Sequence, residues 1–118
     1  MRESQIQRAC LDLLEALRLK GWPVYATRSN SGRVRTIDGY SVTLCREGWP
    51  DITAIIRGRF VGIETKGTKG RQGQAQKKAQ QQIEAAGGVY LLVNQLSQLR
   101  EYLGVGEHDR NGQGISQC

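Results

Sequence analysis

Two short runs on either side of Arg57-Gly58 constrain the fold of this 118-residue chain more than any other segment. Residues 51–56 and 59–65 have the composition of strands. The two residues between them have the length of a tight hairpin turn. The runs are therefore expected to pair antiparallel, with Ile56 facing Arg59 and Asp51 facing Glu64.

That register gives the hairpin two different faces. One face carries the apolar side chains expected in the core, namely Ile52, Ala54, Ile56, Val61 and Ile63. The other face places Asp51 opposite Glu64, where paired Cβ atoms lie about 4.5–5.5 Å apart. Lys66 follows on the same side because side chains alternate along a strand. A slip of one residue would exchange the two faces.

Two carboxylates this close need a cation, or one of them must hold a proton. Lys66 offsets the negative charge of one carboxylate. A Mg²⁺ or Mn²⁺ ion, which prefers hard oxygen ligands, would neutralise both carboxylates. Such an ion polarises a phosphoryl oxygen and lowers the pKa of a bound water. Lys66 would then position that water or stabilise the developing charge. The alternative is an ordinary ion cluster across two surface strands.

Glu3 is a third candidate acid. It precedes Cys10 by seven residues, almost two helical turns, and therefore shares the apolar side of a helix with Ile6 and Cys10. In that position its carboxylate could approach the sheet. The alternative is a helix-start carboxylate that is favoured only by the helix dipole.

The other segments predict helices and strands in alternation. Helices are expected over residues 3–20, 74–86 and 95–103 (with Asn94 as the cap), and strands over 24–27, 36–37, 40–45 and 89–93, the last buried within the sheet. The two short strands surround Asp38-Gly39 and follow a polar loop over 28–35. This order predicts an α/β or α+β layer fold. Residues 1–103 would form one domain, followed by a polar, glycine-rich tail over 104–118.

The charge is concentrated near the central hairpin. Seventeen Lys and Arg against eleven Asp and Glu give a net charge of +6. Residues 57–78 alone hold seven basic residues and one acid, so they account for the whole excess. This pattern favours a nucleic-acid partner, although a solvated lysine-rich loop is the alternative. The candidate DNA-contacting residues are Arg28, Arg33, Arg35, Lys69, Arg71, Lys77 and Lys78.

Several protein classes are disfavoured. No apolar run approaches the roughly 18 residues of a membrane span. Cys10, Cys45 and Cys118 are odd in number and widely spaced, which favours a reducing cytosol over a disulfide framework. The single histidine, His108, argues against a structural zinc site. No Gly-Lys-Ser/Thr follows the glycines of residues 67–73, so no nucleotide cofactor is expected.

The motif Gly48-Trp49-Pro50-Asp51-Ile52, followed by Gly62-Ile63-Glu64-Thr65-Lys66, resembles the motif pair of the PD-(D/E)XK nuclease superfamily. Three further features indicate a particular group within this superfamily: the helix that begins Glu3-Ser4-Gln5, the loop over 28–32, and Gln76. Together they make the chain similar to a stand-alone, phage-type VRR-NUC domain and to archaeal Holliday junction resolvases. The resemblance covers residues 1–103.

This resemblance implies a restriction-endonuclease-like core, a central mixed β-sheet flanked by helices, and a Mg²⁺- or Mn²⁺-dependent nuclease. It implies Asp51 and Glu64 as metal ligands, joined by Glu3, directly or through water, and by the backbone carbonyl of Thr65. Lys66 matches the lysine of the motif, Gln76 the glutamine of the second helix, and Ser31 a serine near the scissile phosphate.

The expected substrate is branched DNA such as a Holliday junction. The expected assembly is a homodimer, in the cytoplasm of a bacterial host if the chain is phage-encoded. The alternatives are a flap- or nick-directed nuclease and a non-catalytic basic module that binds DNA during repair.

Overall fold

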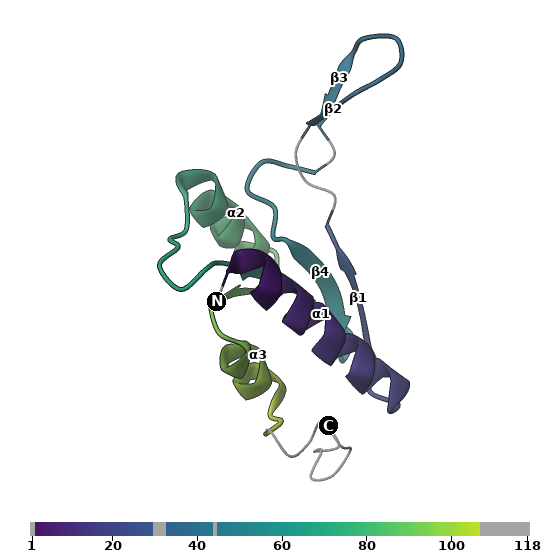
Figure 1. Ribbon diagram of the computed structural model, residues 1–118, viewed down its shortest axis with the longest axis vertical. Coiled ribbons are helices and arrows are strands. Elements are labelled where there is room, and N and C mark those ends of the chain that lie inside the picture. The colour runs from purple at the N-terminus through teal and green to yellow at the C-terminus, as the bar shows by residue number, and fades with distance from the viewer. Residues whose placement is uncertain (1, 30–32, 44, 107–118) are drawn as a thin grey trace.

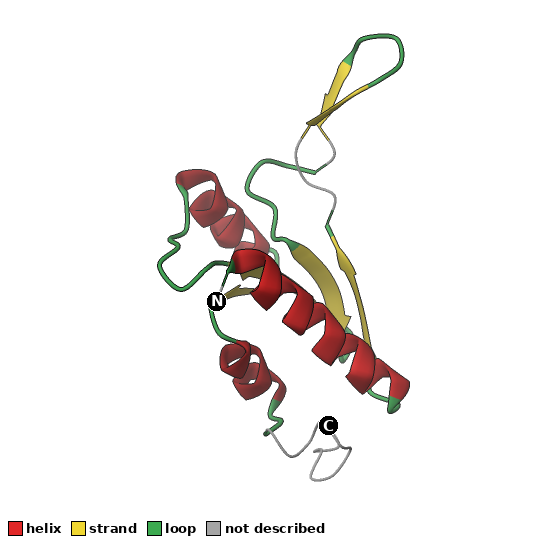
Figure 2. Cartoon of the chain, viewed as in Figure 1, coloured by secondary structure: helices red, strands yellow, loops and turns green. Residues whose placement is uncertain are grey.

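The computed structural model describes residues 2–29, 33–43 and 45–106. Its elements are, in order, α1 (Glu3–Leu19), β1 (Val24–Arg28), β2 (Arg33–Arg35), β3 (Ser41–Thr43), β4 (Ile52–Ile56), β5 (Arg59–Thr65), α2 (Gln74–Ala85), β6 (Val89–Val93) and α3 (Leu96–Leu103) (Figure 1). The main sheet has the order β1-β4-β5-β6 and is mixed, because only β5 and β6 run parallel. The predicted α/β class with a mixed sheet between helices is therefore confirmed (Figure 2).

One face of the sheet packs against α1 and α3. The inward residues of α1 recur at helical spacing, and all are buried: Ile6, Cys10, Leu13, Leu14 and Leu17. They meet the apolar face of the β4–β5 hairpin in a single core, to which Leu99 and Leu103 of α3 also belong. In Figure 1, α1 crosses in front of the strands with its N-terminus toward α2. The apolar periodicity of the first segment thus predicts both the helix and its buried side.

The turn between β4 and β5 produces the predicted register. Arg57 and Gly58 have φ angles of 54° and 79°, the left-handed pair that a two-residue hairpin turn requires. Ile56 pairs with Arg59, and Ile52 pairs with Ile63. The guanidinium of Arg57 stacks 4.5 Å from the ring centroid of Trp22, which stabilises a conformation that non-glycine residues rarely adopt.

The opposite face of the sheet is only partly covered. α2 lies over its β5–β6 half, where Ile83 of α2 packs near Phe60 of β5 and Gly88. Over β1 and β4 the paired residues Tyr25 and Ile55 remain 73% and 54% exposed. This uncovered part of the sheet lies beside α2.

The second hairpin differs from the prediction. Its strands are β2 and β3, so Arg33–Arg35 form a strand where a loop was expected, and Asp38-Gly39 lies in a longer loop over residues 36–40. Backbone hydrogen bonds between Thr36 and Tyr40 and from Gly39 to Thr36 close that loop. The hairpin projects from the body of the molecule (Figure 1).

Two further expectations are corrected. β6 is an edge strand of the sheet rather than a buried one, and Leu92 is 42% exposed. Gln95 occupies the N-cap position of α3 instead of Asn94, and the Gln98 side chain accepts hydrogen bonds from the backbone N–H groups of both residues. Cys10 and Cys45 are free thiols. No helix in the described part of the chain is long and apolar enough to cross a membrane.

Candidate functional site

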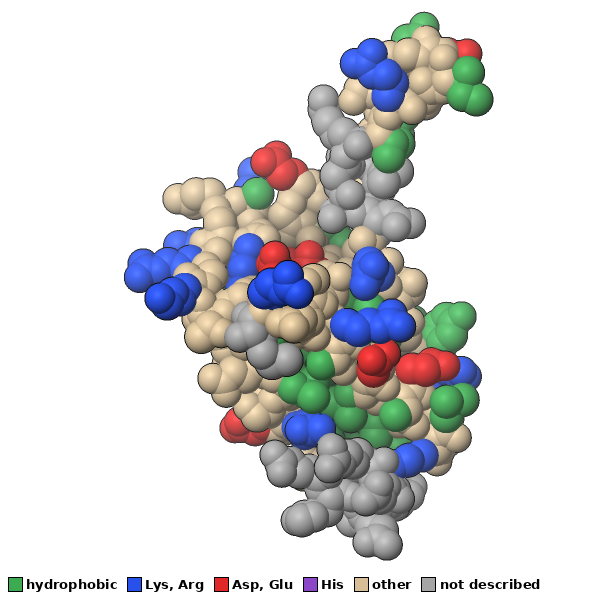
Figure 3. Space-filling model, viewed as in Figure 1, with side chains coloured by type: hydrophobic (Ala, Val, Ile, Leu, Met, Phe, Trp, Pro, Cys, Tyr) green, Lys and Arg blue, Asp and Glu red, His purple; other side chains and the backbone are tan. Residues whose placement is uncertain are grey.

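Three elements bring three acidic side chains together at one end of the main sheet. Glu3 is the first residue of α1, Asp51 directly precedes β4, and Glu64 is the penultimate residue of β5. One carboxylate oxygen from each lies within 4.8 Å of the others. In Figure 3, acidic side chains near the middle of this face have Lys and Arg side chains on both sides. The hairpin register predicted that Asp51 and Glu64 meet, and the resemblance to the nuclease superfamily implied that Glu3 joins them.

Asp51 is held by a neighbour that the sequence analysis considered only for its backbone carbonyl. The backbone N–H of Thr65 donates to Asp51 Oδ2 at 2.9 Å, and the Thr65 hydroxyl donates to the same oxygen at 2.8 Å. Thr65 itself is fully buried. Because both donors use Oδ2, this contact fixes the carboxylate without occupying Oδ1.

Glu64 is held in a comparable way by α2. The Gln76 side-chain amide donates to Glu64 Oε2, while its own oxygen accepts from the backbone N–H of Gly73 at 2.8 Å. That second bond fixes the orientation of the amide, so its NH₂ group faces the carboxylate. Glu64 is only 1% exposed, and its Oε1 is buried with no hydrogen-bond partner among the described residues.

Lys66 lies on the same side of the cluster. Its Nζ is 3.5 Å from Glu64 Oε2 and 4.0 Å from Glu3 Oε1. Burial and, after it, the charge of Asp51 raise the pKa of the Glu64 carboxyl to about 7, although the ammonium of Lys66 acts in the opposite direction. One ammonium therefore does not offset the cost of burying a carboxylate beside two others.

The donor set fits a hard divalent cation. A buried carboxylate oxygen without a hydrogen-bond donor normally costs free energy, and a metal ion would remove that cost. Three carboxylates with no histidine or cysteine among them suit Mg²⁺ or Mn²⁺ better than zinc. Glu3, Asp51 and Glu64 could hold such an ion. The backbone carbonyl of Thr65 as a further ligand stays a prediction.

Close backbone packing keeps these residues in place. A Cβ at Gly62 would lie 2.6 Å from Cγ of Pro50, so only glycine lets Pro50 pack there and fix the approach to Asp51. Gly48 has a φ of +82°, and a Cβ there would lie 2.2 Å from the carbonyl oxygen of Ala75. The segment before Asp51 is thus pressed against the first turn of α2, next to Gln76.

Ser29 and Thr53 form a support that the sequence analysis missed. Ser29 donates its backbone N–H to the carbonyl of Asp51 at 2.7 Å, and its hydroxyl lies 2.8 Å from that of Thr53. Trp49 also donates its Nε1–H to the Thr53 hydroxyl at 2.9 Å. The sequence signal for this support was the hairpin register, which places Thr53 on the same face of the hairpin as Glu64. Ser31 lies outside the described residues.

The candidate DNA-contacting residues fall into two groups. Lys69 and Arg71 lie in the loop between β5 and α2, and Lys77 and Lys78 follow Gln76 on α2, so all four are near the acid cluster and exposed. Arg28 ends β1, whereas Arg33 and Arg35 belong to the projecting hairpin. The structure therefore does not gather all of them on one compact surface.

Comparison with family models, with curated proteins and with solved structures finds no match to this chain. Its function is therefore proposed from the site itself.

Proposed function

We propose that this chain is a nuclease with a PD-(D/E)XK core that hydrolyses phosphodiester bonds in DNA with a bound Mg²⁺ or Mn²⁺. The observation that carries the proposal is the buried Oε1 of Glu64, which has no hydrogen-bond partner in the described part of the chain and lies beside Asp51 and Glu3. A carboxylate in that state needs a proton or a cation. Among the described ion pairs, the ammonium of Lys66 contacts the other oxygen of Glu64, Oε2, so a metal ion could still bind at Oε1.

The bound ion would polarise the phosphoryl oxygen and lower the pKa of the attacking water. The chain's own residues prepare the site for that chemistry. Thr65 and Gln76 each hold one oxygen of a ligand carboxylate, so neither carboxylate must reorient when substrate binds. Lys66, 3.5 Å from Glu64, supplies a positive charge that orients the water or stabilises the negative charge that develops on the phosphate.

The charge distribution supports DNA as the substrate. The net charge of +6 is accounted for by residues 57–78, which include the loop next to the acid cluster and the start of α2. Such a field attracts a phosphate backbone without reading its sequence. We propose structure-selective cleavage of branched DNA by a homodimer, because two copies of the site would allow two paired cuts in one junction.

The test combines cleavage with metal binding. Asp51→Asn and Glu64→Gln should abolish cleavage of linear, nicked, flap, splayed and four-way DNA in Mg²⁺ or Mn²⁺. Both should also lose Mn²⁺ binding, measured by electron paramagnetic resonance. DNA binding should persist or tighten, because each change removes a negative charge near phosphate.

Matched controls are Asp12→Asn and Glu84→Gln, which make the same exchanges at exposed positions on α1 and α2. Cleavage that survives both site substitutions would exclude this site. A protein that binds DNA but neither binds Mn²⁺ nor cuts would instead be a non-catalytic module.

A further inference from the structure

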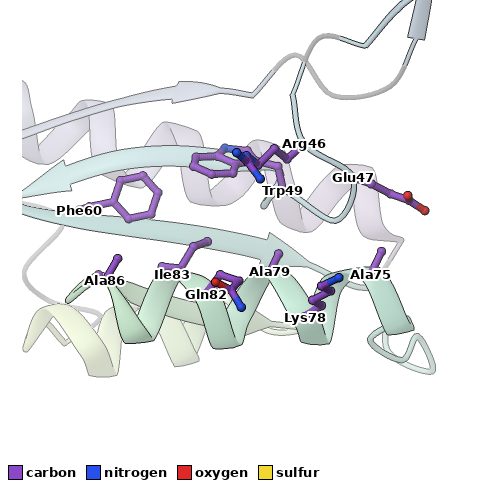
Figure 4. A pocket seen from close by; sticks show the side chains of 11 residues that line it. Arg46, Glu47, Trp49, Phe60, Ala75, Lys78, Ala79, Gln82, Ile83 and Ala86 are labelled. Carbon is purple, nitrogen blue, oxygen red and sulfur yellow. The ribbon is translucent and has the colours of Figure 1, made fainter.

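A groove with a volume of about 950 Å³ runs between α2 and the partly covered face of the sheet. Trp49 and Phe60 line its sheet side, and Ala75, Ala79 and Ala86 line its helix side (Figure 4). Its volume is within the range of ligand-binding clefts. Three of the six residues on the helix side are alanines, whose methyl groups do not reach across the groove, and this leaves it open.

The two aromatic rings are held in place before any ligand arrives. Their centroids are 5.6 Å apart in an edge-to-face arrangement with an interplanar angle of 62°. The indole N–H of Trp49 donates to the Thr53 hydroxyl, which prevents rotation of the ring. Binding against these rings would therefore cost little side-chain entropy.

The groove adjoins the candidate metal site. Trp49 precedes Asp51 by two residues, and Ala75 directly precedes Gln76, whose amide contacts Glu64. A nucleotide neighbouring a phosphate at the acid cluster would thus be in reach of the groove.

The charge at the groove is also that of a nucleic-acid site. Arg46 and Lys78 line it against one acid, Glu47. An aromatic base attached to phosphates matches both the apolar interior and these cations. Gln82, which also lines the groove, offers an amide donor and acceptor for the polar edge of a base.

We propose that this groove binds the base of an unpaired nucleotide next to the scissile phosphate. A base that is stacked and paired within a duplex cannot enter such a groove, whereas an unpaired base can. The proposal rests on the proposed nuclease function and narrows its branched substrates to DNA with a single-stranded segment at the cut, as in flaps and splayed ends, in place of a fully paired four-way junction.

The test fills the groove and measures DNA binding without metal. Ala79→Leu places a larger side chain in the groove, and Ala85→Leu makes the same exchange at an exposed position of the same helix outside it. Leucine and alanine are both good helix formers, so neither change should unfold α2. Ala86→Leu, at the other end of the groove, serves as a second filling variant in case Ala79→Leu misfolds.

Fluorescence anisotropy in EDTA should show that the filling variants bind a labelled single strand roughly 5- to 150-fold more weakly, the range expected for loss of one stacked base. Binding of the same sequence as a duplex should change less than about twofold, because phosphate contacts dominate there. Ala85→Leu should match the wild type. The wild type should bind a strand with abasic sites weakly. Its affinity for that strand should equal the affinity of the filling variants for the intact strand.

Equal single-strand binding by both filling variants and the wild type would overturn the proposal, and so would full-strength binding of the abasic strand. A dimer that dissociates in Ala79→Leu, with single-strand affinity unchanged, would assign the groove to a second copy of the chain. These binding measurements need no metal, so the groove proposal can fail while Mn²⁺ binding and cleavage persist. The nuclease proposal can equally fail while the single-strand binding results support the groove.

Discussion

Replacing Glu64 by glutamine should stabilise the metal-free protein while destroying its metal site. Glu64 is buried, and the pKa of its carboxyl is raised from an ordinary 4.5 to about 7, first by burial and then by the charge of Asp51. Between these two values the folded protein keeps a proton that the unfolded chain has lost. The free energy of unfolding therefore falls as pH rises from about 4.5 to 7 and stays lowered above 7.

The size of the effect follows from the shift. One pKa unit corresponds to about 1.4 kcal/mol, so the rise from 4.5 to about 7 costs the metal-free protein about 3 kcal/mol at pH 8. Glutamine has the same shape, can still accept a hydrogen bond from Gln76, and carries no charge. At pH 8, Glu64→Gln should therefore gain up to about 3 kcal/mol of stability, or about 10 °C in Tm for a chain of this size. Below pH 4.5 the two proteins should be similar.

Urea unfolding in EDTA, followed by tryptophan fluorescence from pH 4 to 8.5, measures this difference, with Glu84→Gln as the exposed control. Added Mn²⁺ should stabilise the wild type at pH 8 and leave Glu64→Gln unchanged, because only a ligand of the folded state adds stability. Wild-type stability that is flat across this pH range, or a less stable Glu64→Gln at pH 8, would refute the reasoning.

Other predictions concern the residues that support the site. Gly48→Ala, whose Cβ would lie 2.2 Å from the carbonyl oxygen of Ala75, should lower the free energy of unfolding by about 2 kcal/mol or more in urea denaturation; an unchanged midpoint would contradict that contact. Thr65→Val should weaken Mn²⁺ binding about tenfold in calorimetric titration, and Thr65→Ser should restore it, since the hydroxyl bond to Asp51 returns. Lys66→Ala should lower the cleavage rate about 100-fold or more while the circular dichroism spectrum stays that of the folded protein, so full activity would remove Lys66 from the chemistry. DNA affinity should fall steeply with salt concentration, whereas a flat response would rule out phosphate contacts by the basic segment.

The acid cluster could be predicted from the sequence because two local rules determine it. A two-residue turn at Arg57-Gly58 sets the register, and strand alternation then puts Asp51 and Glu64 on the same face. The position of Glu3 follows from the apolar side of α1. These two steps depend on neighbours in the chain, whereas the contact of Glu3 with the two strand acids also requires α1 to pack with its first turn at this end of the sheet.

The remaining features depend on contacts between distant segments. The hydrogen bond from Gln76 to Glu64 requires α2 to lie over the end of β5, and helical periodicity does not specify that placement. The alanines of α2 form an apolar stripe that predicts burial, yet they line an open groove. Likewise, the apolar run of β6 predicts a strand buried within the sheet. β6 is instead an edge strand, and it has the same apolar composition because one of its faces packs against the core and the other lies near α2.

The two-residue turn at Arg57-Gly58 also limits how the length of this chain can vary in evolution. An inserted residue that slipped the register of β5 against β4 by one would move Glu64 toward the core and Ile63 toward the acid cluster. Folding and the metal site would then be lost together, so no lineage could pass through a folded but misaligned form. The loop over residues 36–40 carries no such restriction, because Ile37 and Tyr40 are exposed at the tip of a projecting hairpin. Insertions and deletions among natural relatives should therefore be frequent in that loop and rare in the turn.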